Sequence, residues 1–371
     1  MKLNLSSIPA IFFALTITKV IANPNLVVFG NSLSDIGNKV IKNTEVPFWA
    51  GGYSNGPVWS QYLAYFNNYT LINYAFGGAV SNNEYLKSAT GVEITVPSTS
   101  DQINQYTETF KPIFNAISAN KNQSSLNELL KDDIAVIEIG SNDIFYAFDL
   151  IIASNINTTA YIDQIVLNVI DSVQKLIDFG FQKIIVTNIP NLLQIPANKL
   201  LSGSSRNIIQ DSLLRYNQNL DAEITKLALS SGLMFNMPKS YIKLFDIYSL
   251  IDVTISDISR SLEISNTFLP CYLEILGKLV LSCSNSNMYY FVDGFHPATK
   301  VHAITAAAIS ETLARPQADN QITAAFLLPL IEKYNVNNAN SNSNFLFSQN
   351  DNPASLLKIT QYNIINATAS I

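Results

Sequence analysis

The sequence predicts an α/β protein of three layers, in which a central parallel β-sheet carries helices on both faces. Short apolar and β-branched runs alternate along the chain with longer segments of helical periodicity, which is the order expected of β-α-β units. The chain has 371 residues, 48% of them hydrophobic and 13% charged, so it is long and apolar enough to bury a sizeable core.

The expected strands are the apolar runs at 26–29, 71–74, 134–139, 183–187 and 233–235. The expected helices are the periodic segments at 57–66, 160–179, 207–230 and 298–313. Ligands of open parallel sheets bind beyond the carboxyl ends of the strands. Functional residues are therefore expected in the loops that directly follow the strands.

The N-terminal segment has the features of a secretory signal peptide. Residues 1–22 begin with Met1-Lys2, continue through an apolar run that is short for a membrane span, and end at Ala22 before a polar stretch. A buried N-terminal helix is the alternative interpretation. A signal peptide implies that the mature chain is secreted or periplasmic, and no later segment is apolar for long enough to indicate a membrane span.

The C-terminal segment differs in composition from the part before it. We expect one α/β domain at 23–316, followed by a C-terminal extension at 317–371. The extension opens with a pattern that favours one more amphipathic helix at 318–334. An Asn/Ser-rich linker follows at 335–344, and residues 345–371 carry no motif.

Charge and cysteine content restrict the partners. The formal net charge of −6 and the lack of a dense Lys/Arg cluster in the sequence argue against a nucleic-acid partner. After export Cys271 and Cys283 would lie in an oxidising compartment, where we expect a disulfide between them; two free thiols are the alternative. The sequence contains no recognisable set of metal ligands, so we expect neither a metal nor a cofactor.

The chain has two histidines, His296 and His302. His296 precedes Pro297, which suits the first turn of a helix and favours an extended backbone at the residue before it. Asp293 is close enough in sequence to accept a hydrogen bond from His296 Nδ1–H and to fix the tautomer of the ring. This pattern is typical of a general base and its orienting acid. His302 falls inside the following helix, where we expect it to pack or to be solvated.

A serine follows the first expected strand. Ser32 stands at the start of a helical turn, where exposed backbone N–H groups favour an anionic oxygen. Helix capping is the common alternative role for such a serine. Glycine-containing loops at 73–79 and 139–143 follow two further strands, and glycine N–H groups or an asparagine amide are suitable donors to an oxyanion. On their own these two loops are ordinary turns.

Taken in order, these four segments resemble the GDSL/SGNH hydrolase family, in particular its lipase, lysophospholipase and haemolysin-like branch. That family has a serine in the first block, a glycine in the second, an asparagine in the third and an Asp-x-x-His pair in the last. The correspondence covers most of residues 26–313 and includes the segments 53–59 and 101–103. The resemblance implies a hydrolase domain at 23–316 with a flavodoxin-like strand order.

The resemblance gives a role to each matching residue. Ser32 looks like the nucleophile, with His296 as the general base and Asp293 as the acid that orients it. The oxyanion hole looks like the Ser32 N–H, the Gly78 N–H and the Asn142 side chain. The implied reaction is cleavage of a carboxylic ester through an acyl-enzyme on Ser32, which water or an acceptor alcohol then resolves.

Two of the matching blocks do not fit the family pattern in a single, exact way. In the second block the doubled glycine leaves Gly77 as the alternative to Gly78. The first block usually reads Gly-Asp-Ser-Leu, whereas here Asn31 replaces the acid, which keeps the shape and one acceptor oxygen but removes the charge. Asp35 matches the continuation of this block and is expected to cap or brace the loop.

The leading interpretation is an exported serine ester hydrolase that acts on lipid esters, with acyl transfer as a side reaction and transient contact with a membrane surface. A carbohydrate acetyl esterase of the same fold is the second interpretation. A catalytically silent binding protein, inactive because of Asn31, is the third. The head group, the acyl length and the oligomeric state have no motif in the sequence.

Overall fold

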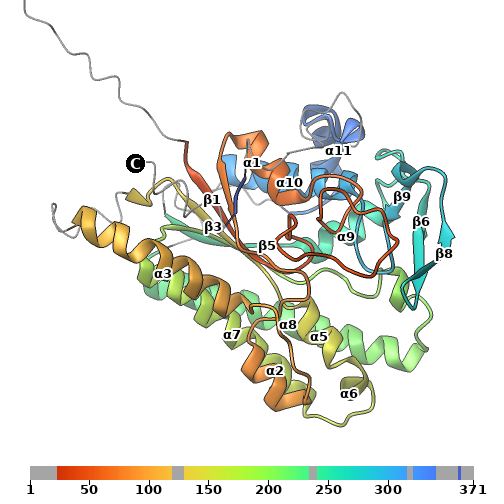
Figure 1. Ribbon diagram of the computed structural model, residues 1–371, viewed down its shortest axis with the longest axis horizontal. Coiled ribbons are helices and arrows are strands. Elements are labelled where there is room, and N and C mark those ends of the chain that lie inside the picture. The colour runs from red at the N-terminus through yellow and green to blue at the C-terminus, as the bar shows by residue number, and fades with distance from the viewer. Residues whose placement is uncertain (1–22, 119–128, 234–239, 316–320, 340–357, 361–371) are drawn as a thin grey trace, which may run out of the picture.

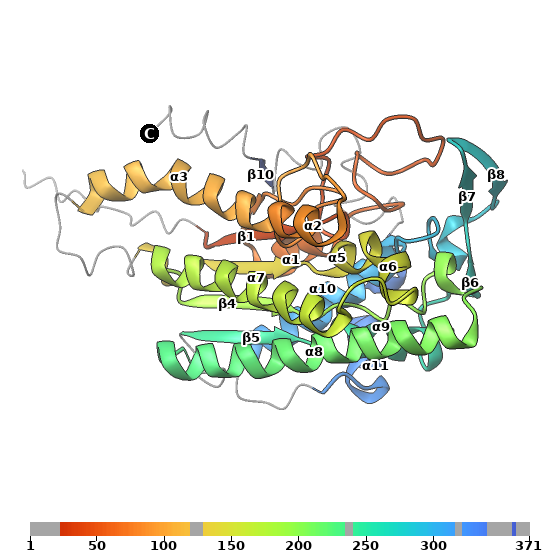
Figure 2. The same cartoon turned by 90° about the horizontal axis from the view of Figure 1, so that it is seen from below.

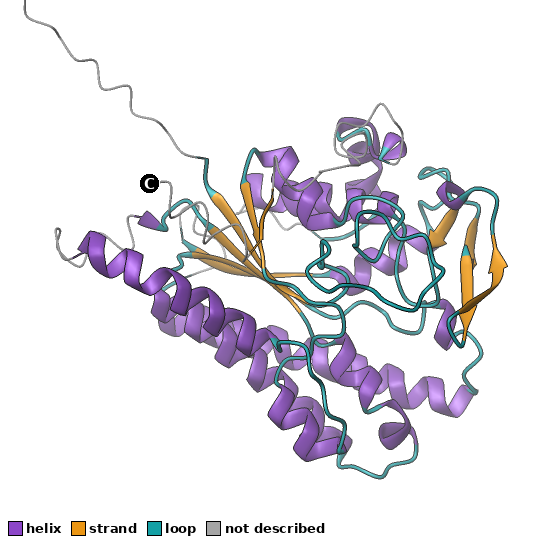
Figure 3. Ribbon diagram, in the orientation of Figure 1, coloured by secondary structure: helices purple, strands orange, loops and turns teal. Residues whose placement is uncertain are grey.

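The computed structural model describes residues 23–118, 129–233, 240–315, 321–339 and 358–360. Its centre is a parallel sheet with the strand order β10-β2-β1-β3-β4-β5 (Figures 1 and 3). The strands are β1 (Asn25–Gly30), β2 (Thr70–Asn73), β3 (Ile134–Glu138), β4 (Lys183–Thr187), β5 (Tyr241–Phe245) and β10 (Lys358–Thr360). Strands β1 to β5 have the flavodoxin-like order 2-1-3-4-5, so the predicted fold class is confirmed.

Two layers of helices cover the two faces of this sheet (Figures 1 and 2). One layer contains α2 (Asn83–Thr90), α3 (Thr99–Ser118), α7 (Thr158–Phe179) and α8 (Gly203–Ser231). The other contains α1 (Trp59–Asn67), α9 (Ile247–Ser256), α10 (Thr299–Ala314) and α11 (Ala324–Lys333). Alternate side chains of β1 enter the two cores, because Val27 faces the first layer and Val28 faces the second.

Helix α10 lies at the centre of the second layer. Its residues 299–312 are all buried, since the sheet lies on one side of the helix and α1 and α11 pack on the others. The helix is therefore buried around its whole circumference, polar residues such as Lys300 and Glu311 included. The close approach of the neighbouring elements is helped by four small residues, Ala303, Ala306, Ala307 and Ala308.

Short elements surround the carboxyl ends of the strands. They are α5 (Ser141–Tyr146), α6 (Phe148–Ile152), the 3₁₀ turns η1 (Pro196–Asn198) and η2 (Ser286–Met288), and the strands β6 (Asn266–Pro270), β7 (Tyr272–Ile275), β8 (Lys278–Ser282) and β9 (Tyr289–Phe291). Strand β6 pairs with β9, and β7 and β8 form an antiparallel hairpin. A disulfide joins Cys271 to Cys283 at the base of this hairpin, and Cys271 N–H donates to Phe291 O at 2.9 Å.

Most expected elements agree with the structure to within a few residues, but the fifth strand differs. The helices expected at 57–66, 160–179, 207–230 and 298–313 correspond to α1, α7, α8 and α10. Of the strand expected at 233–235, residues 234 and 235 lie outside the described part of the chain. In chain order the fifth strand of the sheet is β5, which the sequence pattern does not indicate because Lys243 interrupts its apolar run. The Lys243 ammonium is nevertheless buried and donates to Thr312 O at 3.1 Å.

Residues beyond the predicted boundary at 316 pack on the second helix layer. Leu327, Leu330 and Val336 share the core of α10, and Tyr62 O–H donates to Ala339 O at 2.8 Å. A 3₁₀ turn, η3 (Val336–Asn338), occupies the start of the expected linker. The boundary itself stays a prediction. The expected signal peptide at 1–22 and most of the C-terminal segment after residue 339 lie outside the described residues.

In the part of the chain that the structure describes, no helix is both long and apolar enough to cross a membrane.

Candidate active site

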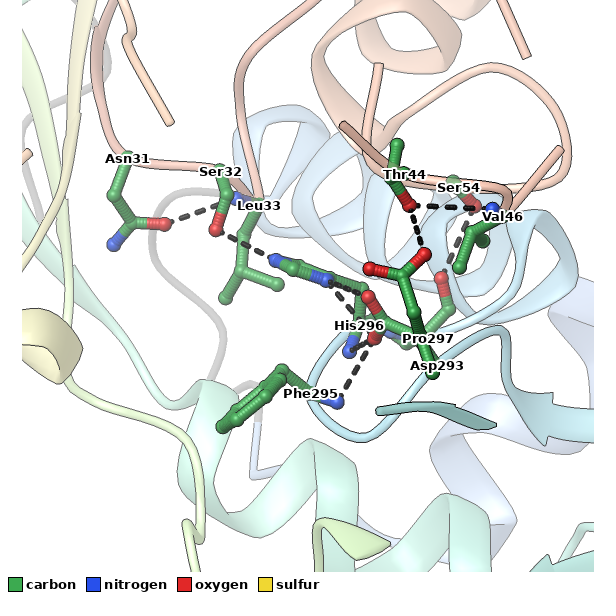
Figure 4. A network of polar contacts seen from close by, with 11 residues as sticks. Asn31, Ser32, Leu33, Thr44, Val46, Ser54, Asp293, Phe295, His296 and Pro297 are labelled. Atoms are coloured by element: carbon green, nitrogen blue, oxygen red, sulfur yellow. Dashed lines mark hydrogen bonds and ion pairs between the residues drawn. The ribbon is translucent and has the colours of Figure 1, made fainter. Parts of the chain in front are cut away.

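The loop after β1 presents Ser32 at the carboxyl edge of the sheet (Figure 4). Asn31 O accepts hydrogen bonds from the N–H groups of Ser34 and Asp35 at 3.1 and 3.0 Å, so the chain makes one tight turn at Ser32. The Asn31 side chain closes the same turn, because its Oδ1 accepts from Leu33 N–H at 2.9 Å. The turn directs the Ser32 hydroxyl towards the loop that follows β9.

That second loop, between β9 and α10, carries Asp293 and His296. A backbone hydrogen bond of 2.8 Å from Val292 N–H to His296 O closes it. Asp293 Oδ1 accepts from the backbone N–H groups of Phe295 and His296 at 2.9 and 2.7 Å. The carboxylate therefore organises the backbone of the turn as well as contacting the imidazole.

The three predicted side chains meet in one continuous hydrogen-bonded arrangement (Figure 4). Ser32 Oγ lies 2.9 Å from His296 Nε2, and His296 Nδ1 lies 2.8 Å from Asp293 Oδ2 and 3.0 Å from Oδ1. A carboxylate beside Nδ1 holds the ring proton there, which leaves Nε2 free to accept a proton from the serine. Residues from opposite ends of the sequence thus form the geometry of an activated hydroxyl nucleophile.

Burial is the largest influence on Asp293, and by itself it would raise the pKa of this carboxyl. The charge of His296 and the hydrogen bonds from the imidazole and from Phe295 N–H together outweigh burial, so the pKa of Asp293 is lowered. An ionised carboxylate in this position is suited to stabilise a positive charge on the imidazole.

Aromatic rings enclose the imidazole of His296. The centroid of the Tyr53 ring lies 4.9 Å from that of the imidazole, and Phe48 meets the imidazole edge-on at 6.2 Å. Ser54 Oγ donates to Pro297 O at 3.0 Å, which fixes the Tyr53 segment against the histidine loop (Figure 4). These contacts hold the imidazole in the orientation that faces Ser32.

The doubled glycine of the second block occupies two distinct positions. Gly77 N–H donates to Asp35 Oδ2 at 2.7 Å and is therefore engaged within the fold. Gly78, with a φ of +85°, borders the cavity in front of the nucleophile. Asn142 borders the same cavity, and its Nδ2 donates to Ala79 O at 2.9 Å, which holds the amide beside the glycine loop. The geometry favours Gly78 over Gly77 as a donor to an oxyanion.

Asp35 braces the nucleophile loop, as the sequence predicts. Its Oδ1 accepts from the N–H groups of Gly37 and Asn38 at 2.9 and 2.7 Å, while Oδ2 accepts from Gly77 N–H. One buried carboxyl therefore ties the turn after β1 to the glycine loop after β2. Burial raises the pKa of Asp35 in spite of these backbone hydrogen bonds.

A cavity of about 590 Å³ opens in front of Ser32. Its size falls within the range of about 300–1,000 Å³ that is typical of small-molecule sites. Gly78, Asn142 and His296 also border it. The rest of the wall is mostly apolar and includes Leu33, Phe145, Phe148, Leu192, Ile195, Ile247, Ile251, Phe291 and Phe295. An ester held with its carbonyl at Ser32 would therefore have apolar surface beside its acyl chain.

Comparison with known proteins places this geometry in a family. The family model of the GDSL-like lipase/acylhydrolases matches residues 26–309. The chain belongs to this family. A GDSL esterase/lipase of Arabidopsis thaliana is 25% identical over 81% of this chain and 94% of its own length.

Two bacterial relatives are similar over somewhat less of their length. The thermolabile hemolysin of Vibrio parahaemolyticus is 24% identical, and the match covers 77% of this chain and 63% of the hemolysin. The phosphatidylcholine-sterol acyltransferase of Aeromonas hydrophila is 25% identical, and the match covers 70% of this chain and 69% of the acyltransferase. As a GDSL-like lipase/acylhydrolase, the protein is a carboxylic ester hydrolase.

Two buried carboxyl groups of this GDSL-like hydrolase were given no role from the sequence. Asp143 accepts from the N–H and the Oγ of Ser81 at 3.0 and 2.6 Å. Glu138 accepts from Asn31 Nδ2 at 3.0 Å. Burial raises the pKa of Glu138 to about 8 and that of Asp143 to about 7. A single acid within the apolar run of β3 is the signal that could have drawn attention to Glu138.

The second histidine of this GDSL-like hydrolase is buried in α10, and it also borders the cavity. Burial lowers the pKa of His302 to about 3, so its ring is neutral, in agreement with the packed alternative from the sequence. Within the described ranges, no group of three or more His, Cys, Asp or Glu side chains could hold a metal ion.

Proposed function

We propose that this enzyme hydrolyses lipid esters through an acyl-enzyme on Ser32. His296 Nε2, 2.9 Å from Ser32 Oγ, takes the hydroxyl proton as Oγ attacks the ester carbonyl carbon. Asp293 retains the proton on Nδ1 and stabilises the imidazolium. The carbonyl oxygen becomes an oxyanion, which accepts hydrogen bonds from the N–H groups of Ser32 and Gly78 and from the Asn142 amide.

The tetrahedral intermediate then collapses. The bond from carbon to the leaving alcohol breaks, His296 Nε2 returns its proton to the alcohol oxygen, and the acyl group remains on Ser32. A water molecule next gives a proton to Nε2 and attacks the acyl carbon, and the second collapse releases the carboxylic acid and regenerates the serine. An alcohol in the place of this water gives acyl transfer, the reaction in the name of the Aeromonas relative.

The apolar cavity is the observation that carries the lipid assignment. A large apolar wall beside the nucleophile favours an acyl chain, because each buried methylene contributes about 0.8 kcal/mol. An acetyl group would contact little of a cavity of about 590 Å³. The cavity therefore favours medium or long acyl chains over the acetyl esters of the second interpretation.

The deciding experiment is hydrolysis of p-nitrophenyl acetate, butyrate, octanoate and palmitate by the purified mature protein. We expect kcat/KM to rise from acetate to octanoate, and Ser32→Ala to lower kcat by about 10³-fold or more. Ser230→Ala, at an exposed serine of α8, is the matched control and should keep the full rate. A preference for acetate would favour the carbohydrate esterase, and equal rates for Ser32→Ala and the parent protein would exclude the serine mechanism.

We also propose that the enzyme is exported, with the mature chain beginning after Ala22. The Cys271–Cys283 disulfide supports this proposal, because disulfides persist in oxidising compartments. N-terminal sequencing of protein from the culture medium or the periplasm tests it. Recovery of the chain only in the cytosol, with Met1 retained, would contradict it.

The β7–β8 hairpin supports a transient contact with a phospholipid surface. Its inner face is docked on the protein, where Glu274 accepts from Thr44 Oγ at 2.6 Å. Its outer face and tip are mostly apolar, with Ile275 and Val280 exposed and Leu276 100% exposed, and they carry one exposed cation, Lys278. The hairpin lies at the edge of the molecule (Figure 1), and Tyr272 N–H at its base donates to Val292 O, next to Asp293, at 2.8 Å. A lipid surface is the partner we propose, because it would also hold the ester substrate.

A further inference from the structure

The nucleophile loop leaves β1 directly opposite a buried acid. Glu138 ends β3, and the register of the sheet pairs it with Gly30, the last residue of β1. Its side chain is 2% exposed. It therefore lies beneath the turn that carries Ser32, on the central strand next to β1.

Glu138 contacts the residues on both sides of Ser32. Its Oε1 accepts from Asn31 Nδ2 at 3.0 Å, and its Oε2 accepts from Ser34 Oγ at 2.8 Å. Trp59 Nε1 donates to the same serine oxygen at 3.1 Å, so Ser34 is held from two directions. The same Asn31 side chain also closes the turn, as described above. One carboxyl group thus fixes the residues that precede and follow the nucleophile.

The backbone of β1 at Gly30 lies very close to Glu138. A Cβ at Gly30 would lie 2.6 Å from Glu138 O and 3.2 Å from Glu138 Oε2, so only glycine is compatible with this contact. The contact between loop and carboxyl is therefore a tightly packed feature, in which a small displacement of one side displaces the other.

We propose that Glu138 is a positioning residue for Ser32 and that it takes over, from the neighbouring strand, the place of the acid missing from the nucleophile loop. Asn31 and Glu138 then form a matched pair, in which an amide donor faces a carboxyl acceptor across β1 and β3. The proposal rests on the assignment of Ser32 as the nucleophile and adds Glu138 as the group that holds Ser32 in position.

The pair explains why asparagine replaces the usual acid at position 31 in this chain. Burial keeps the pKa of Glu138 high, and the hydrogen bonds from Ser34 and Asn31 oppose burial only in part. An aspartate at position 31 would put a second carboxyl oxygen about 3 Å from Glu138 Oε1 in a buried site, where two carboxyl groups cannot both ionise. Restoring the usual residue of the family should therefore harm this enzyme.

The test is a reciprocal exchange, with Asn31→Asp alone and Asn31→Asp combined with Glu138→Gln. We expect Asn31→Asp to lower kcat on p-nitrophenyl butyrate by roughly 10- to 100-fold with little change in KM, because a small displacement of the nucleophile affects the chemical step. The double variant reverses the direction of the amide–carboxyl pair and should recover most of the lost kcat. If Asn31→Asp does not fold, Ser34→Ala is the second variant, and kcat should fall while the melting temperature is kept.

A matched control lies at the other end of the same two strands. Asp133, also buried, accepts from Asn25 Nδ2 at 2.9 Å. Asp133→Asn should lower the melting temperature and leave kcat unchanged. Full kcat in Asn31→Asp, equal impairment of the single and the double variant, or full kcat in a folded Ser34→Ala would each overturn the proposal.

Labelling by a fluorophosphonate separates this inference from the proposed mechanism. If the probe does not label Ser32 in the parent protein, the serine mechanism itself fails. If it labels Ser32 equally fast in the parent protein and in Asn31→Asp, the mechanism stands and the role of Glu138 is refuted. We expect labelling in both, with a slower rate in Asn31→Asp.

Discussion

Carboxyl groups around the nucleophile respond to burial in opposite ways, and their partners are the cause. Asp293 faces an imidazole that can carry charge, so its pKa is lowered although it is buried. Glu138 and Asp35 face neutral donors, which do not compensate for the loss of water, and their pKa values are raised. The imidazole thus outweighs the effect of burial on the pKa of Asp293, whereas the neutral donors around Glu138 and Asp35 do not.

Replacement of the orienting acid is the sharpest change at the scale of one residue. In Asp293→Asn the amide nitrogen can donate to His296 Nδ1 and so force the ring proton onto Nε2, which then cannot accept the proton of Ser32. We expect kcat to fall by about 10²- to 10⁴-fold with KM for a soluble ester nearly unchanged. Steady-state kinetics check this, with Asp163→Asn, at the partner of Arg215, as the control. An unchanged kcat in a folded Asp293→Asn would remove Asp293 from the mechanism.

The sequence predicts which residues form the site, but not which residues hold them in position. Ser32, Asp293 and His296 follow strands or precede a helix at recognisable spacings, and the structure brings them together. The contact between Asn31 and Glu138 spans 107 positions and depends on the register of two strands, which no local pattern specifies. The contact between the Tyr53 ring and the imidazole is likewise not specified by a local pattern, although the segment 53–59 matches the family.

At the scale of the element, the structure differs from the sequence prediction where a polar group is buried or where strands are short. Strands β1 to β4 are apolar runs and were found. Strand β5 contains Lys243, and burial lowers the pKa of this lysine to about 8. Its ammonium donates a hydrogen bond to Thr312 O of α10, which is far away in the sequence. The β7–β8 hairpin has apolar side chains that face outwards, so the alternation of apolar and polar residues along it does not indicate which face packs on the core.

This outward apolar face gives the prediction that belongs to the hairpin. Leu276→Asp should reduce sedimentation with phosphatidylcholine vesicles, because a charge at the fully exposed tip removes the apolar contact with the lipid. Hydrolysis of a soluble butyrate ester should be unchanged, since the tip lies outside the cavity lining. Leu229→Asp, at another leucine that is 60% exposed, on α8, is the matched control. Equal vesicle binding by both variants and the parent protein would refute the proposed lipid contact.

At the scale of the whole molecule, α10 connects the site to the C-terminal segment. The helix begins beside the histidine loop, and its buried surface is completed by residues 324–339. Glu311 of α10 accepts from Tyr334 O–H at 2.8 Å and also contacts Lys333. The covering segment is therefore attached by polar contacts as well as by its leucines.

Truncation tests whether the predicted boundary at 316 divides the fold. A chain that ends at Arg315 would expose α10 and lose the burial of Leu327, Leu330 and Val336, each worth about 1.5–3 kcal/mol. We expect this chain to aggregate or to melt at a much lower temperature than the parent. A chain that ends at Asn344 keeps residues 324–339 and should retain most of the stability. Equal thermal melts for the two truncated chains would support an independent extension at 317–371.

Buried ionisable groups make the stability of the whole molecule depend on pH. Burial raises the pKa of Glu138 from 4.5 to about 8 and that of Asp143 from 3.8 to about 7, so the folded state keeps protons that the unfolded chain releases. Their stabilising contribution is complete below the unfolded values and is lost as the pH rises through 7 and 8. His302 acts in the opposite sense, because its pKa is lowered from 6.5 to about 3, and its contribution is lost as the pH falls below 6.5.

Stability should therefore fall above neutral pH. Between pH 6.5 and 8 the pH dependence of stability is set mainly by Glu138 and Asp143, so the melting temperature of the parent protein should fall. The melting temperature of Glu138→Gln should fall less steeply, because this variant lacks one of the two titrating groups. Calorimetric melts of the parent protein and of Glu138→Gln over this pH range check the trend. A melting temperature that rises from pH 6.5 to 8 in the parent protein and in Glu138→Gln alike would mean that the two carboxyl groups are ionised in the folded state.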